Sequence, residues 1–266
     1  MITGLAILDE ALFIACESSP VVEVYDAITY EFIRRWKIGL ADPGGIESCK
    51  SKKCLYIVGW KTCGESRTIL KVDTQGVQIT EWSVADSWSS LSVAHDSNVI
   101  LTVQGENKVI EYSPDGHVNH EICVELSSDS GEAFNLWHSV KLASGNFVVC
   151  GSPVGLDGNL HRVFIVDNHG TLQLSFSESD DFNIAKLDEP VYLLVDKDGY
   201  LLLADRNNHR VLLFNSNLEC QKELLFTENN KLRFPSILCL DTSGGLLHVA
   251  ESDSRESRVL MFKLRS

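Results

Sequence analysis

One short apolar pattern recurs six times along the chain and limits what the chain can fold into. Each copy is a run of five residues, mostly Val, Leu, Ile, Phe and small residues, as in a buried strand. The starts of successive copies lie 43, 44, 48, 54 and 46 residues apart. The copies are Leu12–Cys16, Leu55–Gly59, Val99–Val103, Phe147–Gly151, Leu201–Asp205 and Leu247–Glu251. A period of about 40 to 50 residues predicts a structure built from repeated units.

The clearest repeat, Pro190–Phe214, shows what one unit contains. Three apolar runs alternate with turn residues, which is typical of an antiparallel meander. Asp196 and Gly199 belong to the first turn, and a polar loop with the sequence Asp-Arg-Asn-Asn-His separates the second run from the third. The three expected strands are Tyr192–Asp196, Tyr200–Ala204 and Arg210–Phe214.

Five copies continue into a fourth, more polar segment, whereas the sixth copy has only three strand-like runs. Four short strands at this period are typical of a β-propeller blade, since packing blades around an axis buries both faces of each sheet. We therefore predict an all-β, six-bladed β-propeller of four-stranded antiparallel blades, with the last blade lacking its outer strand. The chain is expected to be a single domain, 1–266, with blades at approximately 1–40, 41–87, 88–129, 130–181, 182–226 and 227–266.

The pattern also raises the question of how the ring closes. Many propellers close with a strand from the opposite terminus, and no such strand is available in these copies. We expect either closure by packing of the first blade against the last, or a natural protein that continues upstream of Met1.

Composition narrows the classes of partner. The net charge of −14 comes from 37 acids against 23 Lys and Arg, and such a field disfavours RNA and other phosphate backbones. No apolar run is long enough to span a membrane. The N-terminus is a poor signal peptide, and none of the eight cysteines forms a C-x-x-C pair. Reduced thiols and a cytoplasmic location are therefore expected, with no metal and no cofactor.

The clearest repeat, Pro190–Phe214, resembles a known family. Pro190, Asp196-x-Asp-Gly199, the strand ending in Ala204-Asp205, and Asn208-x-Arg210-Val211 match the pattern of the NHL repeat. The sixth copy matches it in part, the third retains Gly105-Glu-Asn-Lys-Val109, and the others keep mainly the strand pattern. The resemblance implies a six-bladed NHL-type propeller. Its motif residues are expected to be chiefly structural, with Gly199 (like Gly145 and Gly244) supplying a positive φ and the others bonding locally. These residues are Asp205, Asn208, Arg210, Gly199 and Asp196.

The resemblance also implies a function, because NHL domains often present partners to a ubiquitin-ligase module. This chain has no RING or B-box array of cysteine and histidine, so a ligase link would run through a partner or a missing N-terminal region. We predict a non-catalytic protein-binding scaffold that takes a protein or peptide on the face formed by the loops after the second strands and between blades. Acids outnumber bases in those loops by 18 to 11. The candidate binding residues are Arg206, Asn207, His209, His138, Trp137, Trp88 and Trp60.

Two alternatives remain open. NHL-like propellers include amidoglycolate lyases, which hold zinc on channel histidines, and only His138 fits that pattern here. Lactonase-type propellers need a calcium cage and a Gly-Glu-Gly-Pro-like segment, and neither is found. Some NHL domains bind RNA on a basic face, which the acidic charge disfavours. The enzyme and RNA hypotheses are therefore secondary.

Overall fold

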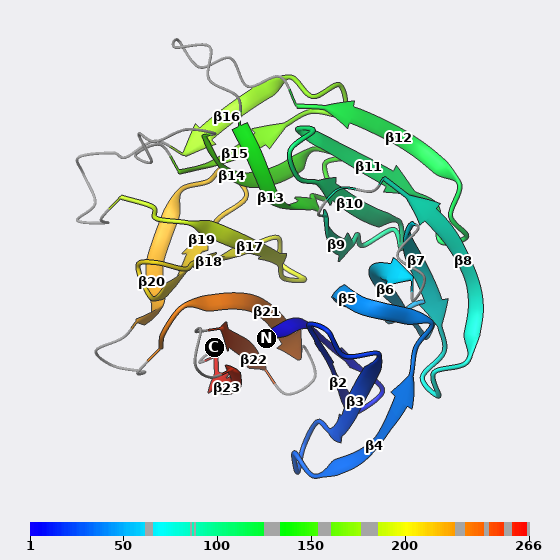
Figure 1. The fold of residues 1–266 in the computed structure, drawn as a ribbon. Helices are drawn as coiled ribbons and strands as arrows, with labels where there is room; N and C mark the ends of the chain where they lie inside the picture. The colour runs from blue at the N-terminus through cyan, green and yellow to red at the C-terminus, as the bar shows by residue number, and fades with distance from the viewer. Residues whose placement is uncertain are drawn as a thin grey trace.

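The computed structural model describes residues 1–61, 66–85, 87, 89–124, 134–153, 161–176, 186–226, 232–241, 245–252 and 257–264. Within these ranges all regular structure is β-strand, arranged in five four-stranded sheets and one three-stranded sheet. Figure 1 shows the six sheets around a common axis. The predicted fold class, a six-bladed propeller whose last blade has three strands, is confirmed. No helix in these ranges is long and apolar enough to cross a membrane.

Numbered in chain order, the first three blades occupy the following strands. They are β1 (Ile2–Leu8), β2 (Ala11–Cys16), β3 (Val21–Asp26), β4 (Phe32–Lys37); β5 (Leu40–Cys49), β6 (Cys54–Lys61), β7 (Arg67–Val72), β8 (Gln78–Val84); β9 (Ser89–Val93), β10 (Val99–Val103), β11 (Lys108–Tyr112), β12 (Val118–Cys123). The last three blades are β13 (Phe134–Lys141), β14 (Phe147–Pro153), β15 (Arg162–Val166), β16 (Leu172–Phe176); β17 (Pro190–Val195), β18 (Leu201–Asp205), β19 (Arg210–Phe214), β20 (Cys220–Phe226); β21 (Pro235–Asp241), β22 (Leu246–Ser252), β23 (Ser257–Lys263).

Tight turns hold consecutive strands of each blade in an antiparallel meander. In the turn after β17, the Asp196 carboxylate accepts hydrogen bonds from the backbone N–H groups of Asp198 at 2.9 Å and Tyr200 at 2.8 Å. Gly199 completes that turn with φ +85°, and Gly145 has φ +93° in the corresponding turn of blade four. Both glycines therefore have the predicted positive φ, whereas Gly244 lies outside the described residues.

Burial changes from the axis outward within each blade. In blades two to five the second and third strands are almost wholly buried, as in β10 and β7, because they are sandwiched between neighbouring blades. In blade one β2 and β3 mix buried with half-buried residues, and in blade six every residue of β23 is exposed or half-buried. Fourth strands are amphipathic, and β8 alternates between exposed and half-buried residues. This gradient explains why the fourth segments are more polar in the sequence.

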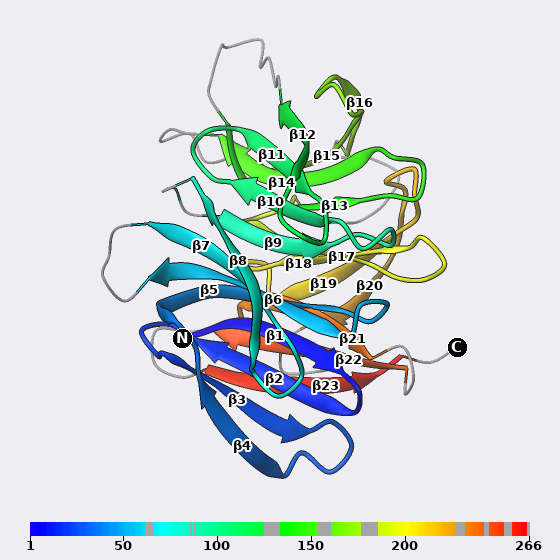
Figure 2. The same cartoon turned by 90° about the vertical axis from the view of Figure 1, so that its right-hand side faces the viewer.

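The hydrophobic core consists of six clusters, one in each seam between neighbouring blades. Blades one and two share a cluster that includes Phe13 and Leu55, and blades four and five share one that includes Val148 and Leu203. The sixth cluster joins blade six to blade one. Figure 2 shows the ring from the side, with the blades stacked against one another.

The ring closes by packing of the last blade against the first, because β1–β4 and β21–β23 form separate sheets. The Ser252 hydroxyl donates to the carbonyl of Ile2 at 3.4 Å. The Tyr30 hydroxyl lies 3.5 Å from Nε2 of His248, across the same seam. Among the described residues no strand of one terminus enters the sheet of the other.

Candidate functional site

The Asp205–Arg210 motif is an internal brace of blade five. The Asp205 side chain is fully buried and Arg210 is 4% exposed. Arg210 Nε donates to Asp205 Oδ2 at 2.7 Å, and Asn208 Nδ2 donates to the same oxygen at 2.8 Å. Asp205 Oδ1 accepts the backbone N–H of Asp188 at 2.8 Å. These bonds hold the segment that leads into β17 against the loop after β18.

The remaining residues of this loop also bind neighbouring segments. Arg206 Nη1 pairs with the Glu189 carboxylate at 2.7 Å, and Asn207 Nδ2 donates to Asp188 at 3.1 Å. His209 Nδ1 accepts the backbone N–H of Phe234 at 3.1 Å, at the start of blade six. The loop therefore connects blades five and six, and binding of a partner by Arg206, Asn207 and His209 stays a prediction.

Two of the three candidate tryptophans pack in the ring. Trp137 is half-buried, and its Nε1 donates to the Ser152 hydroxyl at 3.1 Å. Trp60 is also half-buried, with the guanidinium of Arg67 5.9 Å from its ring centroid. Trp88 lies outside the described residues.

His138 is a tie between three inner strands. Its ring is 1% exposed, Nδ1 accepts the N–H of Leu193 at 3.4 Å, and Nε2 lies 3.2 Å from the carbonyl of Leu91. The second contact requires a proton on Nε2, so both ring nitrogens are in use. Burial lowers the pKa of His138 to about 4, and the imidazole is neutral at physiological pH.

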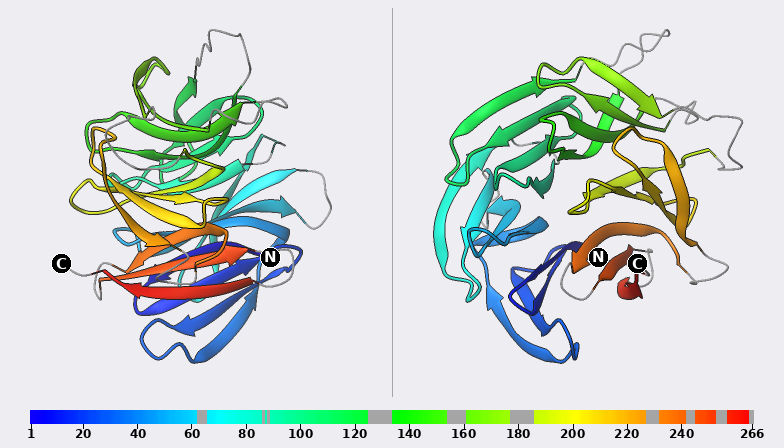
Figure 3. Two further views of the ribbon diagram at one scale, coloured as in Figure 1. Left: turned by 90° about the vertical axis from the view of Figure 1, so that its left-hand side faces the viewer. Right: turned by 180° about the vertical axis from the view of Figure 1, so that it is seen from behind.

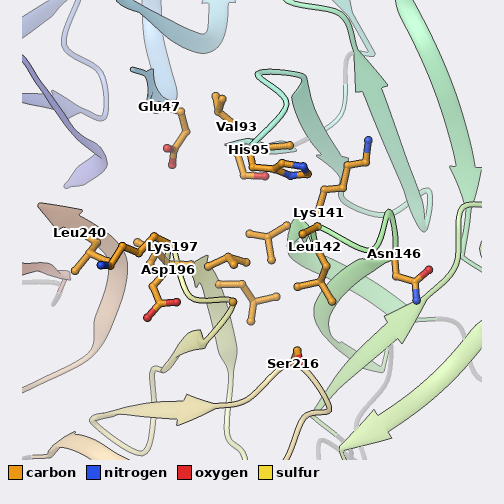
Figure 4. A pocket seen from close by; sticks show the side chains of 18 of the residues that line it. Glu47, Val93, His95, Lys141, Leu142, Asn146, Asp196, Lys197, Ser216 and Leu240 are labelled. Atoms are coloured by element: carbon orange, nitrogen blue, oxygen red, sulfur yellow. The ribbon is translucent and has the colours of Figure 1, made fainter. Parts of the chain in front are cut away.

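A cavity of about 1170 Å³ opens at the other end of the strands, among the turns that join first to second strands. It lies around the ring axis, and five blades contribute to it. Figure 4 shows the side chains that surround its open centre. They include Glu47 from β5, His95 after β9, Lys141 from β13, Lys197 after β17, Ser216 after β19 and Leu240 from β21. The cavity combines charged groups with an apolar wall.

Glu47 is the most unusual group in this cavity. Its carboxyl accepts a short hydrogen bond from the Tyr192 hydroxyl, which comes from the opposite side of the ring. Burial raises the pKa of Glu47 to about 8, although the bond from Tyr192 acts in the other direction. Glu47 is therefore mostly protonated at neutral pH, and Figure 4 shows its carboxyl pointing into the cavity.

The Glu47 contact continues across the axis as a chain of side chains. The Tyr192 ring stacks on His138 with 4.0 Å between centroids, and His138 reaches Leu91. Glu47, Tyr192, His138 and Leu91 belong to blades two, five, four and three. These contacts therefore link the first strands of four different sheets.

A pair of thiols lies beside the cavity. Cys49 and Cys54 are directly opposite each other in the ladder of β5 and β6, and both are buried. A hydrogen bond from the Cys54 thiol lowers the pKa of Cys49 to about 5, and the same bond raises the pKa of Cys54. The seven cysteines that the structure describes are all free thiols.

Sequence reasoning missed Glu47 and Tyr192. Aligning the six copies on their second strands places Gly4, Gly45, Ser90, His138, Tyr192 and Ile237 at one inner-strand position. Two residues further along each strand are Ala6, Glu47, Ser92, Val140, Leu194 and Cys239. Glu47 is the one charged residue among these twelve. A carboxylate at an inner-strand position that is otherwise uncharged is the sequence signal that could have identified Glu47. Within the described ranges, no three His, Cys, Asp or Glu side chains are grouped as a metal site requires.

Comparisons with known proteins find similarity in the fold alone. No protein-family model matches the chain, and no curated protein matches it by sequence. Among solved structures, the hydrazine synthase of Kuenenia stuttgartiensis superposes with a TM-score of 0.67 at 17% identity, covering 98% of this chain and 84% of that one. A protein of unknown function from Bacteroides caccae has a TM-score of 0.66 at 13% identity, with 92% and 84% covered. At these identities the chain shares a propeller fold with both proteins.

Proposed function

We propose that this chain is a non-catalytic binding module of the NHL type that takes a segment of a partner protein into its central cavity. The observation that carries the proposal is the convergence of five blades on one cavity of about 1170 Å³. That volume slightly exceeds the range of about 300 to 1,000 Å³ of small-molecule sites. It therefore suits a few residues of a peptide.

The lining supports recognition of a mixed apolar and polar segment. Leu142, Leu194 and Leu240 offer an apolar wall, while Lys197 and Asp196 stand at the turns. An apolar side chain of the partner would pack on the wall, and its backbone groups would meet the polar residues. The NHL assignment is supported by the Asp205 and Arg210 brace, and the free thiols support a cytoplasmic setting.

Glu47 gives the cavity a specific donor. Because its carboxyl keeps a proton at neutral pH, the O–H can donate to a carbonyl of the bound segment. Tyr192 occupies the other oxygen and fixes the orientation of the carboxyl. A backbone carbonyl or a side-chain amide is thus the group that Glu47 would recognise.

The test uses two matched tryptophan substitutions in equivalent turns. Ser216 and Asn168 are both exposed and both follow the first residue of a turn between third and fourth strands, but only Ser216 lines the cavity. Affinity purification followed by mass spectrometry first identifies a partner and its binding segment. Calorimetry with that segment should then give about tenfold weaker binding for Ser216→Trp. Asn168→Trp should bind like the wild type.

Equal affinity of the two variants would place the ligand elsewhere, and the loop face would be tested next. A gel shift with mixed RNA at physiological salt tests the RNA alternative, and tight binding there would contradict the argument from the net charge of −14. Co-purification of a RING-type ligase would support the link to ubiquitin ligation that the NHL resemblance implies.

A further inference from the structure

The outer edge of β23 differs from the third strand of every other blade. In blades one to five a fourth strand covers this edge, and in the described part of the chain no strand pairs with it in blade six. Val259 is half-buried there. The five residues at the equivalent register position are all fully buried, and they are Val22, Ile69, Val109, Val163 and Val211.

The five existing fourth strands share one feature that explains this burial. Each places a large apolar side chain directly opposite the third-strand residue at this register position. The pairs are Trp36 with Val22, Trp82 with Ile69, Ile122 with Val109, Phe176 with Val163, and Leu225 with Val211. We call these five side chains the anchors.

An anchor packs in the seam between its own blade and the next one. Trp82 contacts Tyr56 of blade two at 6.1 Å and Tyr112 of blade three at 5.9 Å between ring centroids. Its indole lies on Gly116 in a turn of blade three, and the Trp36 indole lies on Gly76 in the same way. The anchors therefore complete the seams as well as the sheets.

The seam between blades six and one has no anchor among the described residues. Val259 faces this seam, where Ile14, Tyr25 and Tyr30 of blade one are only partly buried. Met261, two residues further along the same face of β23, is 43% exposed. The left view in Figure 3 shows β23 in red at the outside of the ring, beside blade one.

Ion pairs between third and fourth strands are a second feature that blades share. In blade three Glu121 of the fourth strand pairs with Lys108 at 2.6 Å, and in blade five Glu223 lies 3.9 Å from Arg210. Each glutamate precedes its anchor by one or two residues. On β23 Arg258 occupies the register position that Lys108 and Arg210 have in their blades. Its side chain is exposed and pairs through Nε with Glu251, as Arg210 pairs with Asp205. Lys263, at the other end of β23, is also exposed.

We propose that β23 is a docking edge for an extended segment of a partner protein, which adds to blade six as an antiparallel fourth strand. The segment carries a large aromatic or aliphatic side chain opposite Val259, in the seam with blade one, and a carboxylate one or two residues before it. Backbone hydrogen bonds supply affinity and the anchor supplies specificity, as in other cases of strand addition. This surface is separate from the central cavity, so either proposal can fail without the other.

The probe is a fluorescent peptide that copies residues 76–85, GVQITEWSVA, which contain β8 and its anchor. Fluorescence anisotropy should show saturable one-to-one binding to the full chain. Replacing the tryptophan of the peptide with alanine should weaken binding by about tenfold or more. Absence of binding, or equal binding of the two peptides, would overturn the proposal.

Two protein variants locate the peptide. Met261→Lys places a charge on the seam face of β23, and Leu172→Lys makes the same change at a residue of β16 that is 44% exposed. Because both positions are exposed, both variants should fold, and thermal melts verify this. Met261→Lys should weaken peptide binding about tenfold, with Leu172→Lys unchanged. Equal effects of the two variants would refute docking at β23. Light scattering that shows a dimer, and its dissociation by the peptide, would also refute the proposal, because the occupant of the edge would then be a second copy of this chain.

Discussion

The carboxyl of Glu47 should make the stability of this protein fall as the pH rises. In the folded state its pKa is about 8, against an ordinary value of 4.5. Between these values the folded chain holds a proton that the unfolded chain releases. Raising the pH through this interval therefore favours unfolding.

The size of the effect follows from the difference between the two pKa values. Subtracting 4.5 from 8 gives about 3.5, which at roughly 1.36 kcal/mol for each pKa unit amounts to about 5 kcal/mol. Glu47 is only half-buried and lines an open cavity, so water screens part of this penalty. We expect a loss of about 2 to 3 kcal/mol between pH 5 and pH 9 that is attributable to Glu47.

Urea unfolding at several pH values, followed by tryptophan fluorescence, measures this loss. The comparison is with Glu47→Gln, which keeps a hydrogen-bonding group beside Tyr192 but does not ionise. The free energy of unfolding of the wild type should decline relative to Glu47→Gln as the pH rises. Glu31→Gln, at an exposed turn residue, should follow the wild type. If the wild type and Glu47→Gln gave parallel profiles, the carboxyl would not be protonated in the folded state.

Three further predictions concern the described contacts. The pKa of His138 is about 4 against an ordinary 6.5, so the free energy of unfolding of the wild type should fall by about 3 kcal/mol as the pH falls from 6.5 to 4. In the same assay His138→Gln should remove most of this loss. If the variant lost as much stability as the wild type, other groups would be responsible. Asp205→Asn leaves the buried Arg210 without its carboxylate and should cost about 3 to 5 kcal/mol in chemical denaturation, whereas a cost below about 1 kcal/mol would show that the pair is not a brace. Gly116→Ala combines a φ of +91° with a contact of 2.6 Å to an indole ring, so it should cost about 1 to 3 kcal/mol more than Gly105→Ala, where φ is +80° and no atom is within 4 Å. Similar melting temperatures for these two variants would contradict the packing argument.

The fold could be predicted because its determinants are local and repeated. An Asp followed three residues later by a Gly, as at Asp196 and Gly199, specifies a turn. The run Leu201–Asp205 and its equivalents in blades two to six are buried on both faces, whereas Ile14 and Cys16 of the first copy are half-buried. The absence of a fourth run in the sixth copy was also readable, and the structure has three strands there. Because the strand pattern recurs in six copies, it identifies the repeat even where a single copy would be too weak to assign a strand.

The cavity could not be predicted in the same way. Glu47 and Tyr192 are 145 residues apart, and their contact depends on how blades two and five face each other across the axis. From the sequence, Arg206 and His209 were predicted to bind a partner, because polar side chains in a loop are usually exposed to solvent. In the structure these side chains bond to Glu189 and Phe234, so the visible polarity of that loop is largely used within the fold. His138 was found from its register, but its burial depends on Leu91 and Leu193 of other blades.

The six seams of the ring differ in how far apart in the chain their two sides are. Five join consecutive blades and can form as soon as the second blade of each pair is made, while the seam of Val259 and Tyr30 joins segments more than two hundred residues apart. Closing so long a loop has an entropic cost that the neighbouring-blade contacts do not bear. The six seams are therefore expected to form at different stages of folding. The five seams between consecutive blades can form one after another, and the seam between blades six and one forms when the ring closes.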